Sequence, residues 1–149
     1  MDKSTNETQI MQTQRTFPYT PDEIYASFSD PGRLMRWWGP KGFTNTFEIF
    51  EFKTGGIWKF IMHGPDGSNF HNENIFKEIE SGQKVVIRHV SHPHFTLTVS
   101  LLPDKEGTKV LWVQEFDDVK VADAVRHIVE PANEQNLDRL HMLLRGELK

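Results

Sequence analysis

The chain has 149 residues and a formal net charge of −4, a length that suits one ordinary domain. It contains no cysteine, which excludes disulfides, thiolate catalysis and cysteine-based metal sites. Its 17 basic and 21 acidic residues are dispersed along the chain, whereas a nucleic-acid-binding protein would carry a basic stripe. No apolar run approaches the ~20 residues of a membrane helix, and the N-terminus lacks the apolar centre of a signal peptide. We therefore expect a single cytoplasmic domain over residues 1–149 that binds neither nucleic acid nor membrane.

The N-terminal segment predicts a disordered start, an edge strand and a short helix. Residues 1–7 are polar and are expected to be disordered. Residues 8–17 mix polar and apolar side chains as an edge strand does. A helix is then expected to begin, because Thr20 can act as its cap, Pro21 suits the first helical position and Glu23 completes a capping box.

A second short helix is predicted by the same combination of residues. Asp30 and Pro31 repeat the cap-plus-proline signal, so this helix should continue as far as Trp37 and Trp38. The segment 39–42, Gly-Pro-Lys-Gly, should end it.

The middle of the chain predicts a set of antiparallel strands. Tight turns at Gly55-Gly56 and at residues 64–67 separate β-prone stretches, which is typical of a meander. Strict alternation in two of the strands places Trp58, Phe60 and Met62 on one face, and Phe95, Leu97 and Val99 on another. The predicted strands are 43–53, 57–63, 69–79, 84–91, 95–102 and 108–116.

The C-terminal segment after Asp117-Asp118 changes to a helical period. Apolar residues recur at helical spacing from Val121 to Leu144. Pro131 should either kink one long helix or start its main part after a break.

This order of elements predicts a hollow. An antiparallel sheet of six to seven strands twists and curls, and one helix, ~10 Å across, is too thin to fill its concave side. Either aromatic side chains fill the remaining space or a cavity is left, and the chain has eleven Phe, four Trp and two Tyr. We expect a ligand pocket that the short helices and the 39–42 loop close at one end.

Five segments resemble, in their order and spacing, the START-like superfamily, also called SRPBCC. Within it, they are similar to the branch named after the C-terminal domain of the heat-shock ATPase activator (AHSA1-like). The resemblance extends over nearly the whole chain and rests on Pro21–Tyr25, Asp30–Pro40, Gly55–Phe60, Gly64–Gly67 and Glu134–Leu140.

The resemblance implies an α+β helix-grip fold of the START/Bet v 1 type, with a curved sheet around a long C-terminal helix and an apolar cavity. The superfamily includes lipid carriers, hormone receptors, polyketide cyclases, oxygenase domains and a co-chaperone domain, so no catalytic residue can be carried over. Many members have a Gly-Trp pair in the terminal helix, where this chain has Glu130-Pro131-Ala132-Asn133.

The candidate ligand site combines aromatic and apolar side chains with two histidines. The same side chains would also suit a solid core, because apolar pockets and cores share a composition. In that interpretation one ring of the tryptophan pair is buried in the core and the other covers the Gly39-Pro40 turn. The candidate residues are Trp37, Trp38, Phe43, Trp58, Phe60, Met62, His89, Phe95, Leu97, Trp112, Leu137 and His141.

The remaining polar residues indicate little specific chemistry. Seven histidines are present, but no spacing brings three ligands together, so we expect no metal and no cofactor. His89 and Glu115 are the strand residues that could serve acid–base catalysis. Alternatively these side chains point outward from the sheet, or they form pairs, as Glu115 could with Arg88. Neither a GxGxxG motif nor a P-loop occurs.

Three functions are compatible with this sequence. The first is a protein with little or no catalytic activity that binds a small, mostly apolar or aromatic molecule through buried apolar area. The second is a cyclase- or hydrolase-type enzyme that uses a polar residue of the same cavity. The third is an interaction module resembling the co-chaperone domain. A homodimer is also compatible with a small aromatic-rich domain.

Overall fold

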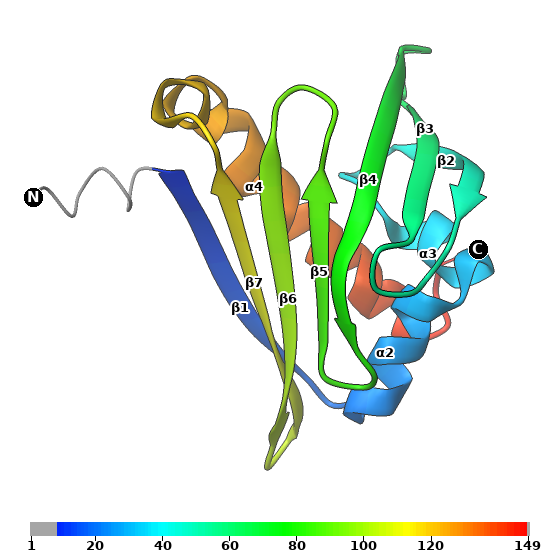
Figure 1. The fold of residues 1–149 in the computed structure, drawn as a ribbon. Helices are drawn as coiled ribbons and strands as arrows, with labels where there is room; N and C mark the ends of the chain where they lie inside the picture. The colour runs from blue at the N-terminus through cyan, green and yellow to red at the C-terminus, as the bar shows by residue number, and fades with distance from the viewer. Residues whose placement is uncertain (1–8, 149) are drawn as a thin grey trace, which may run out of the picture.

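A seven-stranded antiparallel sheet organises residues 9–148, the part of the chain that the computed structural model describes (Figure 1). The expected disorder of residues 1–7 lies outside the described residues. The strand order is β1-β7-β6-β5-β4-β3-β2, so the first strand completes the sheet beside the last one. The strands are β1 (Ile10–Phe17), β2 (Thr44–Phe50), β3 (Ile57–His63), β4 (Asn69–Glu80), β5 (Lys84–His89), β6 (Phe95–Asp104) and β7 (Gly107–Phe116).

Two short helices follow β1, as predicted, and both have the expected caps. They are α2 (Pro21–Ser29) and α3 (Pro31–Trp37). The Thr20 hydroxyl accepts from the backbone N–H of Glu23 at 3.1 Å, and the Glu23 carboxylate accepts from the N–H of Thr20 at 3.2 Å. The Asp30 carboxylate accepts from the N–H of Gly32 at 2.9 Å and so caps α3.

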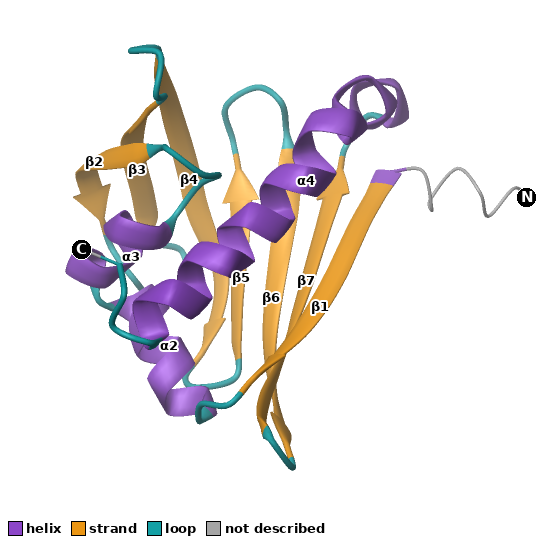
Figure 2. Cartoon of the chain, turned by 180° about the vertical axis from the view of Figure 1, so that it is seen from behind, coloured by secondary structure: helices purple, strands orange, loops and turns teal. Residues whose placement is uncertain are grey.

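The long helix α4 (Val119–Leu144) crosses one face of the sheet diagonally (Figure 2). Asp118 caps it by accepting from the N–H of Lys120 at 2.8 Å. Pro131 lies inside this helix and has no N–H for the carbonyl of His127. In Figure 2 the first turns of α4 are seen nearly end-on while the remainder lies across the sheet, so the helix bends. Of the two predicted roles of Pro131, the structure therefore shows the kink within one helix.

The side of the sheet that faces α4 carries the core. The predicted alternation is confirmed in β3, where Trp58 and Phe60 are buried, and in β6, where Leu97 and Val99 are buried. Trp37 from α3 and Leu137 from α4 complete this cluster from the helical layer. The curved sheet, α2, α3 and α4 thus share one core, as a helix-grip fold requires.

Two predicted strands were too long. The strand predicted over 43–53 ends at Phe50, because the next residues form tight turns in which the N–H of Gly56 bonds to the carbonyl of Lys53 at 2.8 Å. A bulge between Phe47 and Ile49 shifts the register with β3. This bulge explains why apolar residues occupy both alternating positions of β2. The strand predicted over 84–91 ends at His89, where a turn begins.

Candidate ligand pocket

An open pocket of about 630 Å³ lies between the helix-facing side of the sheet, the middle of α4 and the segment 38–43. This volume falls in the range of small-molecule sites. Strand alternation supplies most of its apolar wall, since residues two apart on each strand share the inner face. The apolar side chains of the wall are Trp38, Pro40, Phe43, Met62, Phe70, Pro93, Phe95, Leu97, Trp112, Val129 and Ala132.

Trp38 connects the pocket to the aromatic core. Its ring centroid lies 5.1 Å from that of Trp58, 5.5 Å from that of Trp37 and 5.7 Å from that of Trp112. Trp37 and Trp58 are fully buried, whereas Trp38 is half-buried and lines the pocket. The two neighbouring tryptophans therefore have different places, one in the core and one in the wall.

Side chains from distant elements hold the end of α3, whose last carbonyls lack partners within the helix. Asn45 of β2 donates to the carbonyl of Met35 at 3.0 Å and to that of Trp38 at 2.9 Å. Asn136 of α4 donates to the carbonyl of Trp37 at 2.9 Å. These hydrogen bonds hold the end of α3 in place and so position Trp38 in the wall of the pocket.

Arg139 of α4 holds the same segment over a longer stretch. Burial lowers the pKa of its guanidinium. Five backbone carbonyls offset this burial, because each accepts an N–H of Arg139 at 2.7 to 3.1 Å: those of Arg36, Trp38, Gly39, Pro40 and Phe43.

Polar side chains come to the pocket from both the sheet and α4. Asn133 of α4 donates to the side-chain carbonyl of Gln114 on β7 at 3.0 Å, which links the helix to the sheet. The lining contains no Asp, Glu, Lys or Arg side chain. Its polar members are Asn69, His71, Asn72, His89, His92, Gln114, Asn133 and Asn136.

His89 is the buried titratable group of this wall, with 6% of its surface exposed. Its Nδ1 lies 2.7 Å from the carbonyl oxygen of Pro93, and its Nε2 lies 2.9 Å from the side-chain oxygen of Asn72. Burial lowers the pKa of His89, against the opposing effect of the Pro93 hydrogen bond. The ring stacks on Phe95 with 4.5 Å between centroids.

The predicted site residues fall into two groups. Trp37, Trp58, Phe60 and Leu137 lie in the solid core, and His141 packs edge-on against Phe17 at 5.2 Å. The pocket itself brings together Trp38, Phe43, Met62, His89, Phe95, Leu97 and Trp112.

Sequence reasoning missed the amide side chains and the helical side of the pocket. Asn72 and Phe70 share the inner face of β4, so the alternation of that strand was the available signal. Ala132, Asn133 and Asn136 follow the spacing of one helical face, but polar residues on a helix usually indicate a solvated surface.

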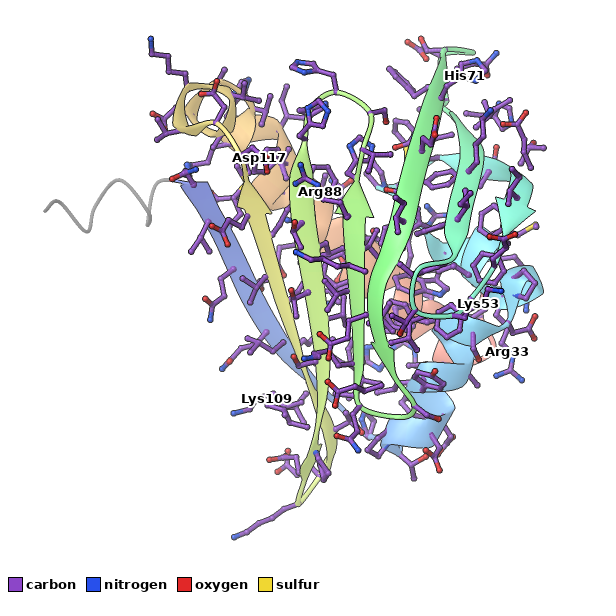
Figure 3. All side chains as sticks on the ribbon, in the orientation of Figure 1. Arg33, Lys53, His71, Arg88, Lys109 and Asp117 are labelled. Atoms are coloured by element: carbon purple, nitrogen blue, oxygen red, sulfur yellow. The ribbon has the colours of Figure 1, made fainter. Side chains whose placement is uncertain are left out.

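The alternative pairing of Arg88 with Glu115 is wrong. Arg88 forms a bidentate ion pair with Asp117, with both N–O distances 2.7 Å, on the side of the sheet away from α4 (Figure 3). This contact lowers the pKa of the Asp117 carboxyl. Glu115 is exposed on that same side, because odd-numbered positions of β7 face outward. Of the two acid–base candidates, His89 alone lines the pocket.

Residues 9–148 contain neither a metal-binding cluster nor a helix that could cross a membrane. No three His, Asp or Glu side chains converge in a way that would hold a metal ion within this range. None of the helices in the described part of the chain is long and apolar enough to cross a bilayer.

Solved structures share this fold over nearly the whole chain. A protein from Arthrobacter aurescens is 24% identical, with a TM-score of 0.87 and coverage of 97% of this chain and 90% of that one. A protein from Nitrosomonas europaea is 16% identical, with a TM-score of 0.85 and coverage of 95% and 97%. An AHSA1 protein from Silicibacter pomeroyi is 20% identical, with a TM-score of 0.76 and coverage of 93% and 99%.

No functionally curated protein matches the sequence. The family model described as "Activator of Hsp90 ATPase homolog 1-like protein" matches residues 18–145. This match spans both short helices, β2 to β7 and all of α4, and the fold agrees with it. The chain belongs to the Activator of Hsp90 ATPase homolog 1-like family, within the START-like superfamily.

Proposed function

We propose that this protein binds a small, mostly apolar or aromatic molecule in the pocket between the sheet, α4 and the segment 38–43. The observation that carries this proposal is the pocket itself, a space of about 630 Å³ with an aromatic wall and a few polar side chains. Small-molecule sites have this composition, in which apolar area supplies affinity and a few polar groups set orientation.

Burial of an aromatic ligand is the main favourable contribution to the proposed binding. A ring system that buries roughly 200 Å² of apolar surface gains about 5 kcal/mol. The half-buried Trp38 offers a ring surface to such a ligand, and Trp112, Leu97 and Ala132 line the same pocket. The amides of Asn72 and Gln114 would then select among ligands by their polar groups.

The test is a titration of tryptophan fluorescence with naphthol, a flavone and a medium-chain fatty alcohol. We expect saturable quenching by at least one aromatic probe, because two of the four tryptophans lie in the pocket wall. Ala132→Phe should weaken that binding about tenfold or more, since the new ring would occupy the space of the ligand.

Ala124→Phe is the matched control, because Ala124 lies on the same helix but is exposed and lines no part of this pocket. It should bind the probes as the wild type does. Flat titrations with all three probes would overturn the proposal, and so would equal affinities of Ala132→Phe and the wild type.

A further inference from the structure

We infer that the molecule this pocket takes is an aromatic acid whose carboxylate is held by His89. This inference rests on the proposed function and adds the chemical class of the ligand. It follows from the hydrogen-bond partners of His89, from the absence of a counter-charge around it and from the aromatic wall beside it.

The hydrogen-bond partners of His89 suit a doubly protonated ring. The carbonyl of Pro93 only accepts, so the Nδ1 that lies 2.7 Å from it carries a proton. The amide of Asn72 donates its own N–H to the carbonyl of Phe70 at 3.2 Å, which turns its oxygen toward Nε2 of His89. A neutral ring satisfies the first partner alone, whereas an imidazolium would donate to both. The Ser91 hydroxyl, 3.3 Å from Nε2, can supply a weaker bond to the neutral ring.

The surroundings of His89 do not supply the negative charge that an imidazolium needs. None of the carboxylates in residues 9–148 forms an ion pair with His89. Burial is the main reason that its pKa is lowered, and the nearby His94 and Arg88 add to the effect. Other titratable groups at this end of the sheet include Glu73 and His71 on β4, His92 in the β5–β6 turn, and Asp117, which already forms an ion pair with Arg88.

An anionic ligand group would complete this arrangement. It would supply the missing charge in a wall that contains no carboxylate, and the protonated Nε2 of His89 would donate to it in place of the Asn72 oxygen. The ring of Phe95 stacks on His89, and Phe95 and Trp112 line the same pocket. A molecule whose acidic group reaches His89 therefore lays its apolar part against aromatic side chains.

The experiment compares naphthoic acid with naphthamide, two probes of nearly the same shape, of which only the acid is ionised. In the free protein the lowered pKa keeps His89 neutral at neutral pH, so binding of the acid must take up a proton. We expect the acid to bind about tenfold more tightly at about pH 5.5 than at about pH 8. The amide should bind equally at both. Calorimetry in buffers of different ionisation enthalpy should show proton uptake with the acid alone.

His89→Gln assigns the effect to this residue, because glutamine keeps a polar tip but cannot take up a proton. This variant should bind the acid about tenfold more weakly at low pH and lose the pH dependence, while its affinity for the amide stays close to that of the wild type. His127→Gln is the matched control, since His127 is exposed on α4 and does not line this pocket. This variant should bind both probes with the affinity and the pH dependence of the wild type.

The outcomes separate this inference from the proposed function. Equal affinity and equal pH dependence of the acid and the amide would overturn the inference but leave the pocket as an apolar binding site. A pH dependence that persists in His89→Gln would overturn the assignment to His89. Binding of neither probe, nor of any other aromatic molecule, would overturn both proposals. The wild-type comparison of the two probes decides the ligand class even where His89→Gln does not fold.

Discussion

Arg139 is the residue that most clearly joins the fold to the pocket. Its guanidinium is half-buried and donates to backbone carbonyls of α3 and of the segment 38–43, with no carboxylate partner among residues 9–148. A planar fork with five N–H donors suits several acceptors at once, which a lysine ammonium cannot match. Arg139 therefore positions the segment that carries Trp38 and Phe43 to the rim of the pocket.

Arg139→Lys should lower the free energy of unfolding by about 1 to 3 kcal/mol, because several partly buried carbonyls lose their donor. Urea unfolding followed by circular dichroism measures this change. Arg145→Lys is the matched control, since Arg145 is more exposed and pairs with Glu147 near the end of the chain. It should stay within about 0.5 kcal/mol of the wild type. Equal stability of the two variants would show that Arg139 does not hold the segment.

At the scale of elements, the first half of α4 depends on a small contact with the sheet. Ala122 is fully buried against Met11 of β1 and Phe116 of β7, in a cluster separate from the main core. The bend of α4 accompanies this docking, because the helix changes direction between its first turns and the part that crosses the sheet (Figure 2).

Ala122→Leu should destabilise the protein by about 1 to 3 kcal/mol, since extra methylenes have no room in a well-packed contact. Ala124→Leu adds the same atoms to the exposed side of the same helix and should stay within about 0.5 kcal/mol of the wild type. Thermal unfolding of both variants measures the difference. A fully tolerated leucine at position 122 would mean that this half of the helix is loosely docked.

The elements themselves were largely predictable from local signals. Caps at Thr20 and Asp30 depend on neighbouring residues alone, and strict alternation marks the buried face of a strand wherever one side meets the core. Strand ends were less predictable, because the turn after Phe50 and the bulge before it depend on pairing with β3. Whether Pro131 kinks or starts the helix depended on how α4 docks, which the local sequence does not contain.

The shape of the sheet and helix led us to expect a pocket, but the residues that line the open pocket of the structure were predictable only in part. Trp58 and Trp112 both lie on inner faces of strands, yet Trp58 belongs to the core alone, whereas Trp112 also lines the pocket. Composition cannot separate the two places, since both are apolar. The helical side of the pocket depends on the angle at which α4 crosses the sheet, so Asn133 and Asn136 could not be assigned to it from their polarity.

At the scale of the whole molecule, parts of the chain that are distant in sequence form the sheet, the core and the pocket together. β1 pairs with β7, and their register joins Phe17 to Thr108. The main core cluster includes Phe17 of β1, Trp37 of α3 and Leu140 of α4, so the sheet and the helices share one main core beside the smaller cluster around Ala122. The pocket likewise draws on β3 to β7 and on α4. This arrangement favours a single cooperative unit.

Unfolding should therefore be one transition, and a ligand of the pocket should shift it as a whole. Far-UV circular dichroism and tryptophan fluorescence should give the same midpoint, since the tryptophans lie where the sheet and the helices meet. An aromatic ligand at 100 times its dissociation constant adds about 2.7 kcal/mol, which should raise Tm by about 5 to 10 °C for a chain of this size. Two separate midpoints would show that α4 and the sheet unfold independently, and a ligand that shifted only one of them would bind to that part alone.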